Sequence, residues 1–103
     1  MVHRLIVSYG QPTDTAAFDA HYRDTHAPLA LKMPGVLRFT YGHPQAMDPA
    51  QPAPYLVAEL DFESEQAMGE AFGTPEGRAT AADVPTFATG GATMAHFAVH
   101  EAS

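Results

Sequence analysis

Apolar side chains recur every three or four positions along residues 18–31, as they do on a helix that turns one side toward a core. Steps of four lead from Phe18 to Tyr22 and then to His26, and Leu29 extends the same side. A histidine is thus expected on or beside the buried side of this helix. It is the most chemically suggestive residue in the sequence.

The same helix should be irregular near its end. Pro28 has no amide hydrogen to donate and biases Ala27 away from helical angles, so we expect the helix to kink or end there. A short continuation reaches Lys32. Thr13 or Asp14 is the expected N-cap, because both side chains accept hydrogen bonds from the first free amides of a helix.

Four segments have the composition of strands, being rich in β-branched and aromatic residues or alternating in polarity. They are residues 2–9, 36–43, 55–62 and 93–100. In the third, every second residue is apolar, which assigns one side of the strand to a helix layer. The residues on that side are Leu56, Ala58, Leu60 and Phe62.

Two more helices are expected in the second half of the chain. Ser64 is a suitable N-cap for an amphipathic segment that continues to Phe72. Thr74 precedes a proline and a glutamate, which is typical of a helix start, so residues 75–83 should be helical. We expect residues 84–91 to form a loop. Residues 44–54 contain four prolines and should form a long exposed connection.

The order strand, helix, strand, strand, helix, strand predicts one α+β domain over residues 1–103 with a ferredoxin-like βαββαβ fold. Its four-stranded antiparallel sheet would carry helices on one face. The bare face should be polar if it met water, yet part of it is apolar. We therefore expect a homodimer in which two sheets face each other and bury roughly 800 Å² per partner. The apolar residues concerned are Val2, Ile6, Val36, Phe97 and Val99.

Composition excludes several classes of function. Five lysines and arginines against twelve acids give a net charge of -7, which disfavours nucleic acid and anionic membranes as partners. The chain has no cysteine, so disulfides, thiolate metal sites and cysteine nucleophiles are absent. No apolar run is long enough for a signal peptide or a membrane span, and we expect a soluble cytoplasmic protein.

The sequence allows two interpretations of His26. As a functional residue it would be pushed toward its neutral form by burial and toward its protonated form by the helix end, which leaves it able to move a proton at neutral pH. As a core residue it would simply bond a backbone carbonyl freed by Pro28. Tyr22 could orient a ligand, or serve only as core.

The other histidines offer no metal site. Five residues turn an α-helix by about 140°, so His21 should lie on the opposite flank from His26 and cannot share an ion with it. His96 and His100 should lie on one strand face but too far apart for chelation. No partner is assigned to His3 or His43.

Two acids in the third predicted strand also need an explanation. Glu59 and Asp61 look like a catalytic carboxylate pair, but both point away from the helices. We expect them at or near the dimer interface, facing Arg4 or Arg38 of a neighbouring strand.

The chain resembles the EthD-like family of dimeric α/β-barrel proteins in four stretches: YGQPTD, AFDAHYRDTHAPLALKMPG, PYLVAELDF and TPEGRATAADVPTFATGG. The resemblance implies a ferredoxin-like fold, a homodimer, a ligand cavity between sheet and helices, and a functional role for His26. The family is often labelled a reductase, but the chain has no glycine-rich nucleotide motif, so we expect no cofactor. Phe39 stands where relatives are expected to carry tyrosine, and Tyr41 is the nearest substitute.

Two functions follow from this resemblance and the residues. The first is a cofactor-free enzyme of isomerase, lyase, oxygenase or reductase type, in which His26 moves a proton of a small hydrophobic carbonyl or aromatic compound. The second is a non-catalytic ligand-binding or accessory homodimer that supports an oxidation system. In both, the expected pocket is formed by Phe18, Tyr22, Leu29, Tyr41, Leu60 and Phe87.

Overall fold

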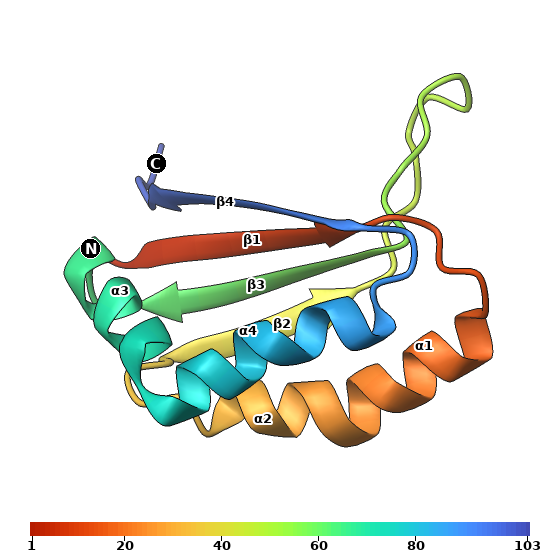
Figure 1. The fold of residues 1–103 in the computed structure, drawn as a ribbon. Helices are drawn as coiled ribbons and strands as arrows, with labels where there is room; N and C mark the ends of the chain where they lie inside the picture. The colour runs from red at the N-terminus through yellow and green to blue at the C-terminus, as the bar shows by residue number, and fades with distance from the viewer.

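The strands form a single antiparallel sheet in a computed structural model that describes all residues, 1–103 (Figure 1). The sheet order is β2-β3-β1-β4, so the first strand lies between the third and the fourth. This arrangement confirms the α+β ferredoxin-like fold. The strands are β1 (His3–Tyr9), β2 (Arg38–Gly42), β3 (Leu56–Phe62) and β4 (Ala92–Ala98).

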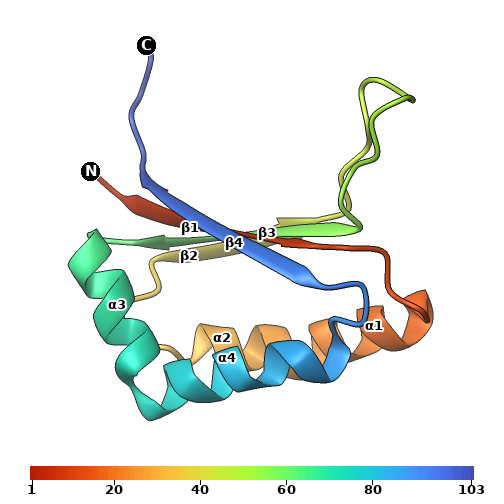
Figure 2. The ribbon, with the colours of Figure 1, turned by 45° about the horizontal axis from the view of Figure 1, so that its top comes forward.

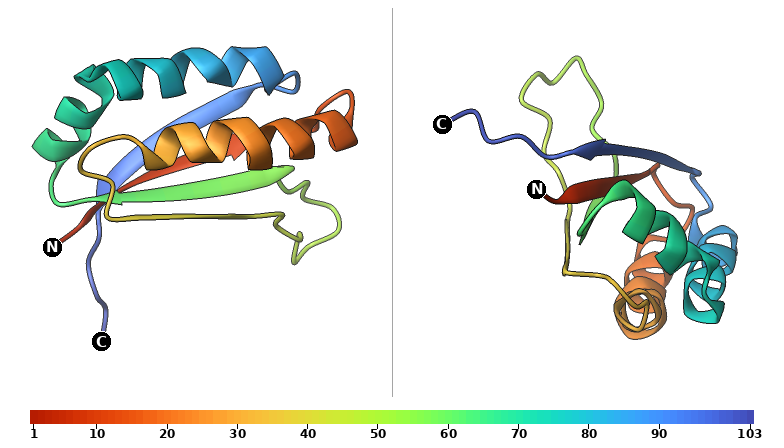
Figure 3. Two further views of the ribbon diagram at one scale, coloured as in Figure 1. Left: turned by 90° about the horizontal axis from the view of Figure 1, so that it is seen from below. Right: turned by 90° about the vertical axis from the view of Figure 1, so that its left-hand side faces the viewer.

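All helices lie on one face of this sheet, as Figure 2 and the right-hand view of Figure 3 show from the side. The three longest begin at the side chains expected to cap them: Asp14, Ser64 and Thr74 each accept a hydrogen bond from the amide three residues later. The helical elements are α1 (Thr15–His21), the π-helical turn η1 (Tyr22–His26), α2 (Ala27–Leu31), α3 (Glu65–Gly73) and α4 (Pro75–Phe87).

The irregularity of the first helix precedes Pro28 and does not end the helix. The amide of Ala27 donates to the carbonyl of Tyr22, five residues earlier, which is the bonding pattern of a π turn. Ala27 itself is helical, with φ -60° and ψ -44°, so the expectation that Pro28 would bias it away from helical angles is wrong. The extra residue of the π turn absorbs the irregularity, and α2 then continues to Leu31.

The last helix is longer than the sequence predicted. Residues 84–87 were expected in a loop, but α4 runs through Pro85 to Phe87, and Ala88 closes it with a bond to the carbonyl of Val84. Phe87 is 6% exposed and packs against the rings of Tyr9, Phe18 and Tyr22. The burial of this ring offsets the backbone bond that Pro85 cannot make.

The core lies between the sheet and the helices. Leu5, Val7 and Tyr9 are buried along β1, and the four alternating residues predicted to face the helices from β3 are all buried. The two edge strands are less covered. Met94 of β4 lies opposite Val7 and points to the helix side but is 56% exposed.

The opposite face of the sheet carries an ion pair that the sequence predicted. Arg4 donates to both oxygens of Asp61 at 2.7 and 3.0 Å, across the β1–β3 pair. This hydrogen-bonded arginine lowers the pKa of Asp61. Phe97 lies opposite Arg4 on β4 and remains 44% exposed. The helix-free face therefore carries both apolar and charged side chains, with the ring of Phe97 beside the Arg4–Asp61 ion pair.

Residues 43–55 join β2 to β3 without helix or strand and extend away from the body as a long arm (Figure 1). This agrees with the exposed proline-rich connection that the sequence predicted.

None of the helices has the length and hydropathy that crossing a bilayer would require.

Gly77 is expected to be the glycine least tolerant of substitution. It is buried where α4 begins against α3, and an added Cβ would overlap the carbonyl oxygen of Ala71 and lie 2.5 Å from the Cα of Phe72. Gly77→Ala should therefore lower the free energy of unfolding by about 1 to 3 kcal/mol in urea titrations. Gly69→Ala is the matched control, since its Cβ meets nothing and should raise stability by about 0.5 to 1 kcal/mol. Equal effects of the two changes would contradict this packing.

Candidate active site

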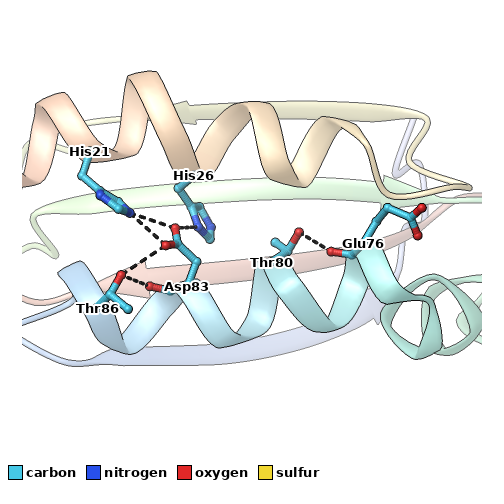
Figure 4. Close-up of polar contacts among 6 residues, drawn as sticks. All are labelled: His21, His26, Glu76, Thr80, Asp83 and Thr86. Atoms are coloured by element: carbon cyan, nitrogen blue, oxygen red, sulfur yellow. Dashed lines mark hydrogen bonds and ion pairs between the residues drawn. The ribbon is translucent and has the colours of Figure 1, made fainter.

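His26 is buried in the π turn and is held by a carboxylate from another helix. Its Nδ1 lies 2.9 Å from Oδ2 of Asp83 in α4, and the two side chains point toward each other between the helices (Figure 4). Phe87 covers the imidazole from the side, with ring centroids 4.8 Å apart. The position and orientation of the ring are thus fixed by one polar and one apolar contact.

His21 binds the same carboxylate, which corrects the expectation that it would lie on the opposite flank. Its Nε2 is 3.0 Å from both oxygens of Asp83. An α-helix would separate residues five apart by about 140°, but bonds from residue i to i+5 bring them back to the same side. The hydroxyl of Thr86 lies 2.6 Å from the backbone carbonyl oxygen of Asp83 and 3.1 Å from its Oδ1, so it shares its proton between the backbone and the carboxylate that the two histidines contact (Figure 4).

The electrostatics favour a neutral imidazole beside an ionised carboxyl. Burial lowers the pKa of His26, and the hydrogen bond to Asp83 only partly opposes it. Burial alone would raise the pKa of Asp83, but the hydrogen bonds from His21, His26 and Thr86 outweigh it and leave that pKa below its ordinary value. The lowered pKa of His26 differs from the balance expected from the sequence, because burial outweighs the opposing effect of Asp83 and the helix does not end at His26.

This arrangement leaves the other ring nitrogen of His26 free. With Nδ1 donating to the carboxylate, Nε2 is an unprotonated acceptor. Nε2 has no hydrogen-bond partner in the chain. Every fully buried side-chain nitrogen or oxygen of the chain does have a partner, so Nε2 is not fully buried. The atom is left to accept a hydrogen bond, and the alternative of a histidine bonded to a freed carbonyl is not what the structure shows.

A cavity of about 270 Å³ lies between the sheet and the helices, and His26 forms part of its wall. Thirteen of its sixteen lining residues are hydrophobic, and the polar ones are His26, Thr80 and His96. The hydroxyl of Thr80 already donates to the carbonyl of Glu76. The cavity therefore suits a mostly apolar molecule with few polar groups.

Two of the expected pocket residues, Tyr22 and Leu60, line this cavity. The other four do not. Phe18 and Phe87 lie behind Tyr22 as part of the aromatic core, with Phe18 stacked on its ring at 5.8 Å. Because the π turn inserts a residue, Ala30 faces the cavity and Leu29 is only half-buried.

Tyr41 is also outside the cavity. It lies on the β2 edge, 47% exposed, with its ring 4.9 Å from that of Tyr22. Phe39, two residues earlier on the same strand face, lines the cavity instead. A tyrosine at position 39 would therefore line the cavity, and Tyr41 does not take that place.

The phenols of Tyr9 and Tyr22 line the cavity in their neutral form. Burial raises the pKa of Tyr9 to about 12 and raises that of Tyr22 as well. Both hydroxyls therefore keep their protons at neutral pH, and the hydrogen bond between them leaves one proton of the pair to donate to an oxygen of a bound molecule.

Asp83 is the functional candidate that the sequence reasoning missed. It was placed at the end of a short helix, next to an expected loop, with no reason to approach the first helix. One pattern in the sequence does indicate it. Thr80, Val84 and Phe87 would share one side of a helix longer than the predicted one, and Asp83 is the acid next to that side. The expected loop at residues 84–91 concealed this pattern.

The fold and the histidine–aspartate pair define a ferredoxin-like α+β protein with an apolar cavity between sheet and helices. The chain belongs to the EthD domain family, which matches residues 10–91. It is 45% identical over 93 residues to an uncharacterised 11.0 kDa protein from the thcB-thcC intergenic region of Rhodococcus erythropolis, a match that covers 90% of each chain.

Solved structures support the same assignment. An EthD family protein from Bacillus halodurans superimposes with a TM-score of 0.88 at 33% identity, covering 97% of this chain and 100% of that one. A dimeric ferredoxin-like protein of unknown function from Thermobifida fusca has a TM-score of 0.73 at 16% identity, covering 96% and 92%. SnoaB from Streptomyces nogalater, a cofactor-independent oxygenase, has a TM-score of 0.63 at 17% identity, covering 97% and 93%. The last two likenesses show the fold alone.

Proposed function

We propose that this protein is a cofactor-free enzyme that acts on a small hydrophobic carbonyl or phenolic compound, with Nε2 of His26 as the proton acceptor. The observation that carries the proposal is the Asp83-bound imidazole in the wall of an apolar cavity, with its second nitrogen unpartnered. A neutral histidine in a water-poor site is a suitable general base at neutral pH. At about 270 Å³ the cavity is at the small end of ligand pockets, which favours compact substrates.

The first chemical step would be removal of one proton. An O–H proton of a phenol, or a C–H proton next to a carbonyl, moves to Nε2 and leaves its electron pair on the substrate. The imidazolium formed is stabilised by the negative charge of Asp83, 2.9 Å from its other nitrogen. Tyr9 and Tyr22 carry the hydroxyls in the cavity wall, and one of the pair can donate to the developing oxyanion.

The fate of that anion decides the reaction class. Return of the proton to another carbon gives isomerisation, and transfer of electrons to molecular oxygen gives oxygenation. The likeness in fold to SnoaB supports including oxygenation among the reactions to be tested. Turnover should therefore be followed by mass spectrometry on a panel of lactones, phenols and quinols, with and without oxygen. The proposal requires turnover of at least one compound without added metal or cofactor.

A second candidate is a non-catalytic binding protein, favoured by the scarcity of polar groups in the cavity wall. Native mass spectrometry of the purified protein distinguishes the two. A small molecule that is retained and returned unchanged, together with no turnover of any panel compound, supports binding alone and removes the enzymatic proposal.

We further propose a homodimer through the helix-free face of the sheet. Related structures include dimeric ferredoxin-like proteins. Ile6 and Val57 are only half-buried there, and Phe97 is 44% exposed. Light scattering after size exclusion should give twice the mass of the chain. Phe97→Asp should shift the protein toward monomer, because it places a charge among these apolar side chains. A monomeric wild-type protein at micromolar concentration would contradict the assembly.

A further inference from the structure

A second cluster of metal-ligating side chains lies where α3 begins, outside the His21–Asp83–His26 group. It consists of His3 from β1, His96 from β4 and Glu65 from α3. Nε2 of His3 and Nδ1 of His96 are 2.8 Å apart, and one ligand atom from each of the three residues lies within 4.8 Å of the others. No sequence motif pairs these two histidines, which are separated by 93 positions.

The fold brings the three side chains together from separate segments. In the β1–β4 pair, His3 is opposite Ala98 and His96 is opposite Leu5, so the two histidines are diagonal neighbours on the helix side of the sheet. His3 is also opposite Phe62, the last residue of β3, and α3 starts three residues later at Glu65. The cluster is thus set by strand register and by a short strand-to-helix connection.

We propose that His3, His96 and Glu65 bind a divalent transition-metal ion, with Zn²⁺ as the best match. Two imidazoles and one carboxylate form the ligand set of many zinc sites that keep an open fourth position. Imidazole suits zinc and its neighbours in the first transition row, whereas Ca²⁺ and Mg²⁺ prefer ligands that are all oxygen.

The observed geometry requires little adjustment. Zinc–nitrogen bonds of about 2.0 to 2.1 Å at a tetrahedral angle separate two ligand nitrogens by about 3.3 Å, which a small rotation of the His96 side chain provides. The Glu65 carboxylate, now within 4.8 Å of both nitrogens, would also have to turn toward them. His96 and Glu65 are both exposed, which gives an ion access from solvent. Glu65 takes part in none of the ion pairs of the chain, so its carboxylate is free to coordinate.

One of these ligands also belongs to the cavity. His96 lines it on the sheet side, and His26 lines it on the helix side. An ion bound by His96 would therefore border the cavity, and its open coordination position is suited to an oxygen atom of a ligand or of water. The metal proposal does not depend on the proton-transfer role of His26, and binding can be measured without any substrate.

The test is metal binding by the full-length protein after removal of any histidine tag. Isothermal titration with Zn²⁺ and visible absorption with Co²⁺ are expected to show one ion per chain, with the absorption bands of a tetrahedral site. His96→Gln and Glu65→Gln should each weaken binding by about tenfold or more, because each removes one ligand. His96 and Glu65 are preferred to His3 for substitution because they are exposed, and circular dichroism checks that the variants fold.

Two further variants make the test decisive. His100→Gln removes an exposed histidine beyond the end of β4 and should leave Zn²⁺ affinity unchanged. His21→Gln, which alters the other cluster, should also leave it unchanged. Absence of Zn²⁺ and Co²⁺ binding by the wild type, or loss of binding in His21→Gln but not in His96→Gln, would overturn the proposal. In the first case His3 and His96 form only a structural hydrogen bond.

Discussion

Replacing His26 by glutamine is expected to lower kcat/KM by about 10²- to 10⁴-fold on any substrate that the panel identifies, since that is the usual contribution of a positioned general base. Glutamine keeps much of the volume of the side chain and can still bond Asp83, so the loss should reflect the missing base and not a lost fold. The wild-type profile of kcat/KM against pH should fall on the acid side, as His26 becomes protonated. Because burial lowers the pKa of His26, this limb should lie below the ordinary histidine value of 6.5.

His21→Gln is the matched control for this change. His21 contacts the same carboxylate but does not line the cavity. Its substitution removes one donor from Asp83 and leaves the Nε2 base in place, so we expect a loss of less than about tenfold. Equal losses in the His21 and His26 variants, or full activity of His26→Gln in a folded protein, would remove His26 from the mechanism.

Asp83→Asn is expected to lower kcat/KM by about 100-fold or more, through the orientation and charge of His26 and not through contact with substrate. An asparagine amide can present either an acceptor or a donor to Nδ1, so the tautomer with a free Nε2 is no longer enforced. It also lacks the negative charge that stabilises the imidazolium. Asp83 is thus a positioning residue, and the loss should be mainly in kcat, with KM little changed.

The same substitution should affect stability in a pH-dependent way. Removing the charged acceptor from two histidines should cost about 1 to 3 kcal/mol at neutral pH, measured by urea unfolding. The pKa of Asp83 is lowered in the folded state, so its contribution is present above the unfolded value of 3.8 and is lost as the pH falls through the folded value. The difference between variant and wild type should therefore shrink in acid.

Asp24→Asn provides the comparison for stability. Asp24 pairs with Arg23 on the surface, where both side chains are more than 60% exposed, so its loss should change stability much less than the loss of Asp83 does. An Asp83→Asn variant as stable and as active as Asp24→Asn would show that the carboxylate does not position His26.

Local patterns were sufficient to predict most of the fold. The alternation in β3, the caps at Ser64 and Thr74, and the order of the elements each depend on residues close together in the sequence, and all are found in the structure. The resemblance to the EthD family rested on residues 18–35 and neighbouring stretches, and the family match confirms it. The strand pairing then followed from the few topologies that short connections allow.

The site was predicted less completely because its geometry depends on contacts between distant segments. His26 was singled out from its place on the apolar side of a helix, but its partner Asp83 lies 57 positions later. The rotation that brings His21 to the same carboxylate comes from a π turn, for which the sequence offered only the irregularity near Pro28. One inserted residue also explains why Ala30 and not Leu29 reaches the cavity.

The central claim is that Asp83 holds His26 as a neutral base with Nε2 free, and nitrogen-detected NMR of the imidazole tests it most directly without a substrate. At neutral pH the ¹⁵N shifts should show a proton on Nδ1 and none on Nε2, and titration should give a pKa below 6.5. Asp83→Asn should remove the preference for that tautomer. A proton on Nε2 in the wild type, or a pKa above 6.5, would contradict the account.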